Sequence, residues 1–143
     1  MTDYNKSNEE EVSVRLNRFS KSYSLKLLSC GDCYRFINSQ LLIDYLCKKF
    51  NIPNVVVYVC NRKRPRNRGC EIHGKYTRRK GDSPQITIYN KTAVKGDVIS
   101  IKAFYDTLLH EFIHHYDYEV LKLDRSIHSA GFYKRISDLK NKL

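Results

Sequence analysis

The residues best suited to chemistry in this chain are His110, Glu111 and His114, which form the pattern HEFIH. Two histidines four residues apart on a helix project from the same face, so both imidazoles can bind one metal ion. Glu111 stands beside them, where it can act as general base on a metal-bound water. The motif therefore predicts a zinc (Zn²⁺) centre of the metalloprotease kind, with His110 and His114 as ligands and Glu111 as the catalytic residue.

A catalytic zinc ion needs three protein ligands, so one more must come from outside the motif. No histidine stands six residues after His114, and the single later glutamate, Glu119, lies on the same helix and points elsewhere. The remaining candidates are His128, Asp124 and Asp138. We expect His128 to be the third ligand because a neutral imidazole suits zinc best, and we keep Asp124 in reserve.

The elements that must position these residues follow from the spacing of the apolar positions. Steps of three and four predict helices over residues 34–50, 100–121 and 130–140. Runs of β-branched and aromatic residues predict a buried strand over residues 54–60 and further strands over 70–77 and 85–90. The expected fold class is α+β: a small three-stranded sheet with a packed helix, followed by a zincin-type catalytic helix and a C-terminal helix.

The chain has 143 residues and a mass of 16.9 kDa, which suits a single domain. Residues 1–30 are polar and predict a weakly ordered segment, with one short element over residues 12–19. The acidic start lacks the apolar core of a secretory signal, and the longest apolar run, residues 55–60, is too short for a membrane span. We therefore expect a soluble intracellular protein with no membrane partner. Five cysteines in such a chain favour free thiols. Cys30 and Cys33 have the CxxC spacing of half a zinc site or of a redox pair, but no second half follows, so a structural role or plain thiols are favoured.

The formal net charge is +11, and most of it is local. Residues 61–80 hold nine of the 26 basic residues and only one of the 15 acidic residues. The part around Pro65 predicts a mobile loop suited to phosphate contacts, and the flanking Tyr58 and Tyr76 could stack on unpaired bases. A nucleic-acid partner is therefore expected. Its candidate contacts are Arg62, Lys63, Arg64, Arg66, Arg68, Arg78, Arg79 and Lys80.

The segment DTLLHEFIHHYDYEVLKLDRSIHSAGFYKRI, residues 106–136, resembles the core of the SprT-like zinc metalloproteases, the family that includes Spartan. That family has a third histidine beyond HExxH, then a small residue and a helix with an early aromatic and basic residues, as in the stretch from His128 onwards. The resemblance implies one SprT-like domain over residues 31–143. It further implies a zinc-dependent endopeptidase that acts on proteins bound or crosslinked to DNA, with single-stranded or distorted DNA as partner.

Other residues near the motif could support the same chemistry. Asp106 and Asp117 lie close to the ligand positions and could orient the imidazoles. His115 is expected to be a neighbour and not a ligand, since it is rotated about 100° from His114 on a helix. A tyrosine could stabilise an oxyanion, and the sequence does not choose between the three candidates Tyr116, Tyr118 and Tyr133.

Two other functions stay open at this point. The first is a cytosolic zinc peptidase or toxin-like effector that is indifferent to DNA. The second is a nucleic-acid-binding module with a vestigial metal site. The oligomeric state does not follow from the sequence.

Overall fold

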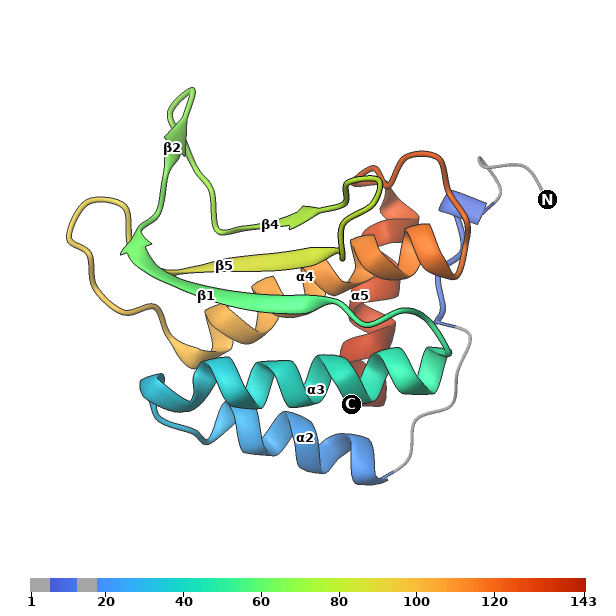
Figure 1. Ribbon diagram of the computed structural model, residues 1–143, viewed down its shortest axis with the longest axis horizontal. Coiled ribbons are helices and arrows are strands. Elements are labelled where there is room, and N and C mark those ends of the chain that lie inside the picture. The colour runs from blue at the N-terminus through green and yellow to red at the C-terminus, as the bar shows by residue number, and fades with distance from the viewer. Residues whose placement is uncertain (1–5, 13–17) are drawn as a thin grey trace.

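The computed structural model describes residues 6–12 and 18–143. Within these residues the fold is α+β, with a small mixed sheet and four α-helices (Figure 1). The four helices are α2 (Arg18–Leu28), α3 (Arg35–Phe50), α4 (Ile101–Glu119) and α5 (Ala130–Lys142). A short 3-10 helix, η1 (Asp32–Tyr34), connects α2 to α3.

The main sheet has three strands in the order β1 (Val56–Lys63), β5 (Gln85–Lys91) and β4 (Gly74–Thr77). In this order β1 and β4 are the two edge strands. The central strand β5 runs parallel to β1 and antiparallel to β4. Two further strands, β2 (Arg66–Asn67) and β3 (Cys70–Glu71), form a separate hairpin. Figure 1 shows this hairpin projecting from the end of the main sheet that lies away from α5.

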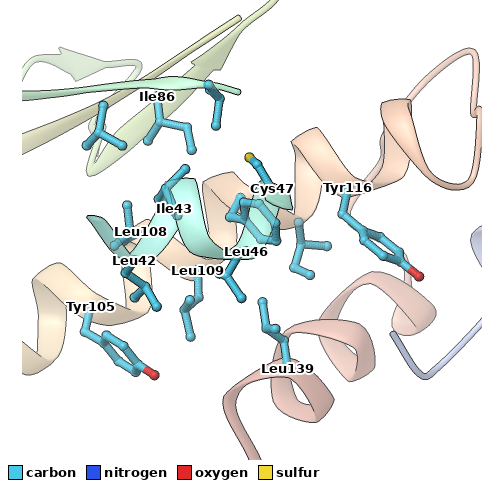
Figure 2. Packing of buried hydrophobic residues seen from close by; sticks show 14 of the residues in the cluster. Leu42, Ile43, Leu46, Cys47, Ile86, Tyr105, Leu108, Leu109, Tyr116 and Leu139 are labelled. Carbon is cyan, nitrogen blue, oxygen red and sulfur yellow. The ribbon is translucent and has the colours of Figure 1, made fainter. Parts of the chain in front are cut away.

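The core lies between the main sheet and the helices α3 and α4, with α2 packed on the far side of both helices (Figure 1). Figure 2 shows Ile86 of β5 above the apolar side chains of α3 and α4. Ile86, Ile43 and Leu108 are fully buried, and burial of each such side chain stabilises the fold by about 1.5–3 kcal/mol. This packing fixes α4, the helix that carries the HExxH motif.

The observed helices α3, α4 and α5 confirm the three helices expected from the sequence, with ends that differ by at most two residues. The strand expected to be buried differs in one respect. The helices cover only one face of the sheet, so the side chains of β1 alternate: Val57 is fully buried, whereas Val56 and Tyr58 are exposed. The stretch 70–77 is divided into β3 and β4, and the strand expected over 85–90 is β5.

The structure differs from the expected weakly ordered lead-in at residues 18–28, which form α2. The inward positions of α2 include Ser20, Ser24 and Leu27, which are all buried. Ser20 Oγ lies 2.9 Å from the hydroxyl of Tyr45 on α3, and the Tyr105 hydroxyl on α4 donates to Ser24 Oγ at 3.3 Å. The short element expected over residues 12–19 falls mainly on residues 13–17, which lie outside the described residues.

Among the residues that the structure describes, none of the helices combines the length and the hydrophobicity that a membrane span requires.

Candidate metal centre

The HExxH motif is held at a fixed rotation by the core face of α4. The helix begins with a capping serine, Ser100, whose Oγ accepts a hydrogen bond from the backbone N–H of Ala103 at 3.1 Å. The two middle positions of the motif, Phe112 and Ile113, are fully buried in the core. Because those positions face inward, the motif's histidines are turned toward the surface beside β4.

The loop after α4 brings His128 to the two histidines of the motif. The ligand nitrogens of His110, His114 and His128 all lie within 4.8 Å of one another. His128 Nε2 is 3.1 Å from Nε2 of His110 and 3.1 Å from Nε2 of His114. Tetrahedral zinc with Zn–N bonds of about 2.0–2.1 Å holds two imidazole nitrogens about 3.3–3.4 Å apart. The three imidazoles therefore fit a zinc ion with little rearrangement.

The two carboxylates considered as third ligands are elsewhere. Asp138 Oδ2 accepts hydrogen bonds from the backbone N–H of Val12 and from the Lys142 ammonium at 2.8 and 2.7 Å. Asp124 lines a different cavity, which does not include the three histidines. Among the described residues, the group of side chains able to hold a metal consists of His110, His114 and His128.

Hydrogen bonding alone does not account for three converging Nε2 atoms, because one N–H can satisfy only one of the two short contacts to His128. A cation accepts all three lone pairs at once. Burial, with a further contribution from the neighbouring histidines, lowers the pKa of His110 to about 4 and that of His114 to about 3. Both imidazoles are therefore neutral at pH 7, which is the form that binds metal ions.

A chain of polar groups that ends in a fully buried ion pair orients His114. Ser126 Oγ donates to Asp117 Oδ2 at 2.7 Å, so its lone pair must accept the proton on Nδ1 of His114, 2.8 Å away. That tautomer leaves the lone pair of His114 on Nε2, directed at His128. Arg135 donates to both oxygens of Asp117, at 3.0 and 2.9 Å, and both side chains are fully buried. Burial raises the pKa of Asp117, and the hydrogen bonds from Ser126 and Arg135 oppose that rise.

Of the two aspartates expected to orient the ligands, only Asp117 belongs to this chain of contacts. Asp106 is a surface residue whose carboxylate pairs with the Lys140 ammonium on α5. Ser126 and Arg135 were not singled out in the sequence. A lone serine in a loop and an arginine among basic residues carry no local signal that they will meet a buried aspartate.

Phe132 forms the floor beneath the three imidazoles. It is fully buried in the first turn of α5, and its ring centroid lies 5.0, 4.6 and 5.0 Å from those of His110, His114 and His128. Ser129 caps this turn, because its Oγ accepts from the backbone N–H of Phe132 at 3.1 Å. The aromatic residue four positions after His128 was a usable signal for a group that packs against the ligand.

Glu111 lies at the back of a cavity of about 450 Å³ that also exposes His110 and His128. The residue is 7% exposed, and burial raises the pKa of its carboxyl group from 4.5 to about 7. A carboxylate with a pKa near the working pH is an effective general base. The structure thus brings together all four residues predicted for the metal centre.

The edge strand β4 borders the same cavity because Gly74 permits a close approach to α4. A Cβ at Gly74 would lie 2.7 Å from Cγ2 of Thr107 and 2.9 Å from the carbonyl oxygen of Thr87, so a side chain does not fit. Gly74 lines the cavity beside Glu111, and the outer edge of β4 has no strand partner among the described residues. An extended peptide can add to such an edge through main-chain hydrogen bonds.

The aromatic neighbours divide into core and site residues. Tyr116 is fully buried against Phe50, with ring centroids 5.2 Å apart, so it does not face the cavity. Tyr118 borders a cavity of about 300 Å³ together with Glu111 and His114. Tyr133 is 51% exposed, and its ring centroid lies 5.9 Å from that of His128. Tyr118 and Tyr133 thus remain as candidates for oxyanion stabilisation.

His115 is a structural residue, as expected. Its Nε2 donates to the backbone carbonyl of Pro53 at 2.7 Å, and its Nδ1 accepts from the hydroxyl of Tyr76 at 2.8 Å. Both nitrogens are occupied, so the ring is not available to a metal. Burial raises the pKa of Tyr76 to about 12, which keeps its hydroxyl protonated and able to donate.

The eight basic residues expected to contact nucleic acid do not form one surface. Four of them, Arg62, Lys63, Arg66 and Arg68, are exposed at the end of β1 and on the hairpin. The exposed Arg79 and Lys80 lie in the loop after β4, beside a cavity of about 790 Å³. Because β4 separates the hairpin from this loop along the chain, the two groups stand at opposite ends of that strand.

Two of the eight residues, one buried and one exposed, make contacts within the protein. Arg64 is buried: its Nε donates to the backbone carbonyl of Tyr89 at 3.3 Å, and its guanidinium lies 3.8 Å from the Glu71 carboxylate. Arg78 forms an ion pair with Glu119 and stacks over the ring of Tyr118 at 5.2 Å. The stretch that was expected to be a mobile loop forms the hairpin β2–β3 instead. Arg64, which precedes the hairpin, connects it to the sheet through the hydrogen bond to Tyr89.

Comparison with protein families, with curated proteins and with solved structures gives no significant match to this chain. What the site does is therefore inferred from its own geometry and chemistry.

Proposed function

We propose that the protein is a zinc-dependent endopeptidase of the SprT-like type. The observation that carries this proposal is the convergence of three imidazole Nε2 atoms, with contacts of 3.1 Å, beside a buried glutamate. Three neutral nitrogen ligands that leave one coordination position open are typical of catalytic zinc. The unpaired edge of β4 beside the cavity favours an extended peptide as substrate.

In the proposed reaction, His110, His114 and His128 hold the ion, and Ser126 keeps His114 in the binding tautomer. When bound, zinc supplies a Lewis acid that polarises a carbonyl and activates a water. Glu111 accepts the proton of that water and returns it to the leaving amine. Its raised pKa of about 7 suits both steps, since the carboxyl group must accept and release a proton near neutral pH.

The test combines a metal analysis with a cleavage assay on a labelled unfolded protein, with and without single-stranded DNA. The wild type is expected to hold about one zinc ion per chain and to cleave the substrate. Glu111→Gln is expected to keep the zinc and to lose activity by about 10²–10⁴-fold, because the amide cannot accept the proton. Asp44→Asn, a carboxylate-to-amide change on α3 away from the cavity, is the matched control. Retained cleavage in Glu111→Gln contradicts the proposal.

DNA is the proposed partner, and proteins bound or crosslinked to it are the proposed substrates. The specific observation that favours DNA is the hairpin β2–β3 with the adjoining end of β1, where residues 61–63 and 65–71 are all exposed. This surface carries Arg62, Lys63, Arg66 and Arg68 and no apolar cluster, which suits contact with phosphates. In this setting the hairpin would hold the nucleic acid while the metal centre cuts the attached protein.

The DNA proposal is tested by fluorescence anisotropy with a labelled single-stranded oligonucleotide. The variant with Arg66→Ala and Arg68→Ala is expected to bind about tenfold or more weakly, because two phosphate contacts are lost. Its control carries Lys21→Ala and Lys26→Ala, two exposed residues of α2, on the opposite side of the molecule in Figure 1. Both variants lose the same charge. Equal weakening in the two variants would mean that only net charge matters and would rule out a hairpin site.

A further inference from the structure

Residues 6–12, here called the N-terminal strap, lie against the start of α5 (blue segment in Figure 1). The backbone carbonyl of Ser7 accepts from Ser129 Oγ at 3.1 Å and from Arg135 Nη1 at 2.9 Å. The carbonyl of Glu9 accepts from the same Nη1 at 2.7 Å. These contacts join residues more than 120 positions apart in the sequence.

The strap fits α5 closely. A Cβ at Gly131 would lie 2.3 Å from the carbonyl oxygen of Ser7 and 2.9 Å from Cα of Asn8, so this contact requires glycine. At the other end of the strap, Val12 is 3% exposed and its backbone N–H donates to Asp138 Oδ2 at 2.8 Å. The strap is therefore seated at both ends, by main-chain contacts at the first turn of α5 and by a buried side chain farther along.

The residues that hold the strap also hold the metal ligands. Arg135 uses its remaining donors, Nε and Nη2, on Asp117, which accepts the hydroxyl proton of Ser126 and so fixes His114. Ser129 directly follows His128 in the chain and bonds to the strap through its Oγ. The carbonyl of Ser7 is thus linked to two of the three ligands. It is linked to His114 through Arg135, Asp117 and Ser126, and to His128 through the adjacent residue Ser129.

We propose that the N-terminal strap is a positioning element of the metal centre, so that its seating on α5 and the binding of zinc stabilise each other. This inference rests on the proposed zinc site. The physical reason is that Arg135 is fully buried and needs the carbonyls of Ser7 and Glu9 as acceptors for Nη1. When the strap is displaced from α5, the guanidinium of Arg135 loses these acceptors. Its alignment with Asp117 is then less well fixed, and so is the conformation of the turn after His128.

The first test displaces the strap in the full chain by Gly131→Ala. The zinc dissociation constant, measured by competition with a chelator, is expected to rise about tenfold, as it does when groups that orient metal ligands are removed. The visible absorption spectrum of bound cobalt(II) is expected to change, because it reports ligand geometry. The control is Gly31→Ala, where an added Cβ meets nothing within 4 Å and the backbone φ of −72° suits alanine. The control should match the wild type in both measurements.

The second test needs no variant and uses the reciprocity of linked binding. Zinc is expected to slow hydrogen exchange of the strap's amides, with that of Val12 as the reporter, by about fivefold or more in the wild type. A wild type that binds zinc with no change in this exchange overturns the inference. So does a folded Gly131→Ala variant with unchanged zinc affinity and cobalt spectrum. If the wild type binds no zinc, the proposed function fails, and the inference fails with it.

Discussion

The metal centre and the basic hairpin β2–β3 are built in opposite ways. At the metal centre the side chains behind the ligands are buried, and the chain of contacts from His114 reaches a fully buried ion pair, Asp117 with Arg135. On the hairpin and the end of β1, residues 61–63 and 65–71 are exposed, and the buried anchor among them is Arg64.

This difference matches what each region is proposed to do. A metal site needs ligands held to within about 0.5 Å, which only packed side chains with satisfied hydrogen bonds provide. Contacts to phosphates act through charge and tolerate movement, so exposed arginines on a small hairpin suffice. Substitutions should therefore affect stability and zinc binding strongly at the centre and weakly on the hairpin.

The largest effect is expected from Asp117→Asn. The substitution leaves the fully buried Arg135 without a counter-charge, which costs about 3–5 kcal/mol in free energy of unfolding. Urea denaturation followed by circular dichroism measures this loss. The matched control is Asp106→Asn on the same helix, whose partner Lys140 is exposed, and the expected change there is within about 0.5 kcal/mol. Similar losses of stability in both variants would contradict the view that the buried pair of Asp117 and Arg135 contributes more to stability than the exposed pair of Asp106 and Lys140.

Removal of zinc is expected to have the next largest effect. At a free zinc concentration of about one hundred times its dissociation constant, the bound ion stabilises the folded state by about 2.7 kcal/mol. Comparison of urea unfolding with saturating zinc and with a chelator gives this difference. In His128→Ala the three-ligand site is broken, so the zinc-dependent stabilisation should largely disappear. A stabilisation that survives in that variant would place the ion elsewhere.

Ser126→Ala should have a smaller effect that is confined to the metal. Without the Ser126 hydroxyl, Nδ1 of His114 loses the acceptor that fixes its tautomer, and zinc affinity is expected to fall about tenfold. Chelator competition measures the change, and Ser126→Thr should restore most of the affinity because it keeps the hydroxyl. Ser137→Ala, at an exposed serine of α5, is the control. Equal affinity in Ser126→Ala and the wild type would contradict the role assigned to this contact.

The sequence predicted the parts of the molecule whose signal is local. The helix around the HExxH motif follows from a strong apolar period, and the choice of His128, which lies close to His110 and His114, followed from the few metal-binding side chains left after His114. Helix α2 was missed because two of its inward positions, Ser20 and Ser24, are small and polar, so the segment lacks an apolar stripe. These serines are buried through hydrogen bonds to tyrosines on other helices, which no local pattern reveals.

The arginines show the same limit of prediction from local sequence patterns. A count of charges treats Arg64, Arg78 and Arg135 alike, as surface cations. Their partners come from distant parts of the chain: the carbonyl of Tyr89, the carboxylate of Glu119 and the pair of contacts with Asp117. Only the fold shows that all three arginines have partners within the protein, and that Arg64 and Arg135 are buried and therefore not open to an anionic partner.

The smallest effect on stability is expected at the hairpin itself. In the variant with Arg66→Ala and Arg68→Ala, the free energy of unfolding should change by no more than about 0.5 kcal/mol, because both side chains are exposed. The same variant should reduce the slope of log affinity for single-stranded DNA against log salt concentration by about 1.4, about 0.7 for each lost phosphate contact. Urea denaturation and anisotropy titrations at several salt concentrations measure the two quantities. A large loss of stability would mean that the hairpin is part of the folded core, and the contrast with the metal centre would then fail.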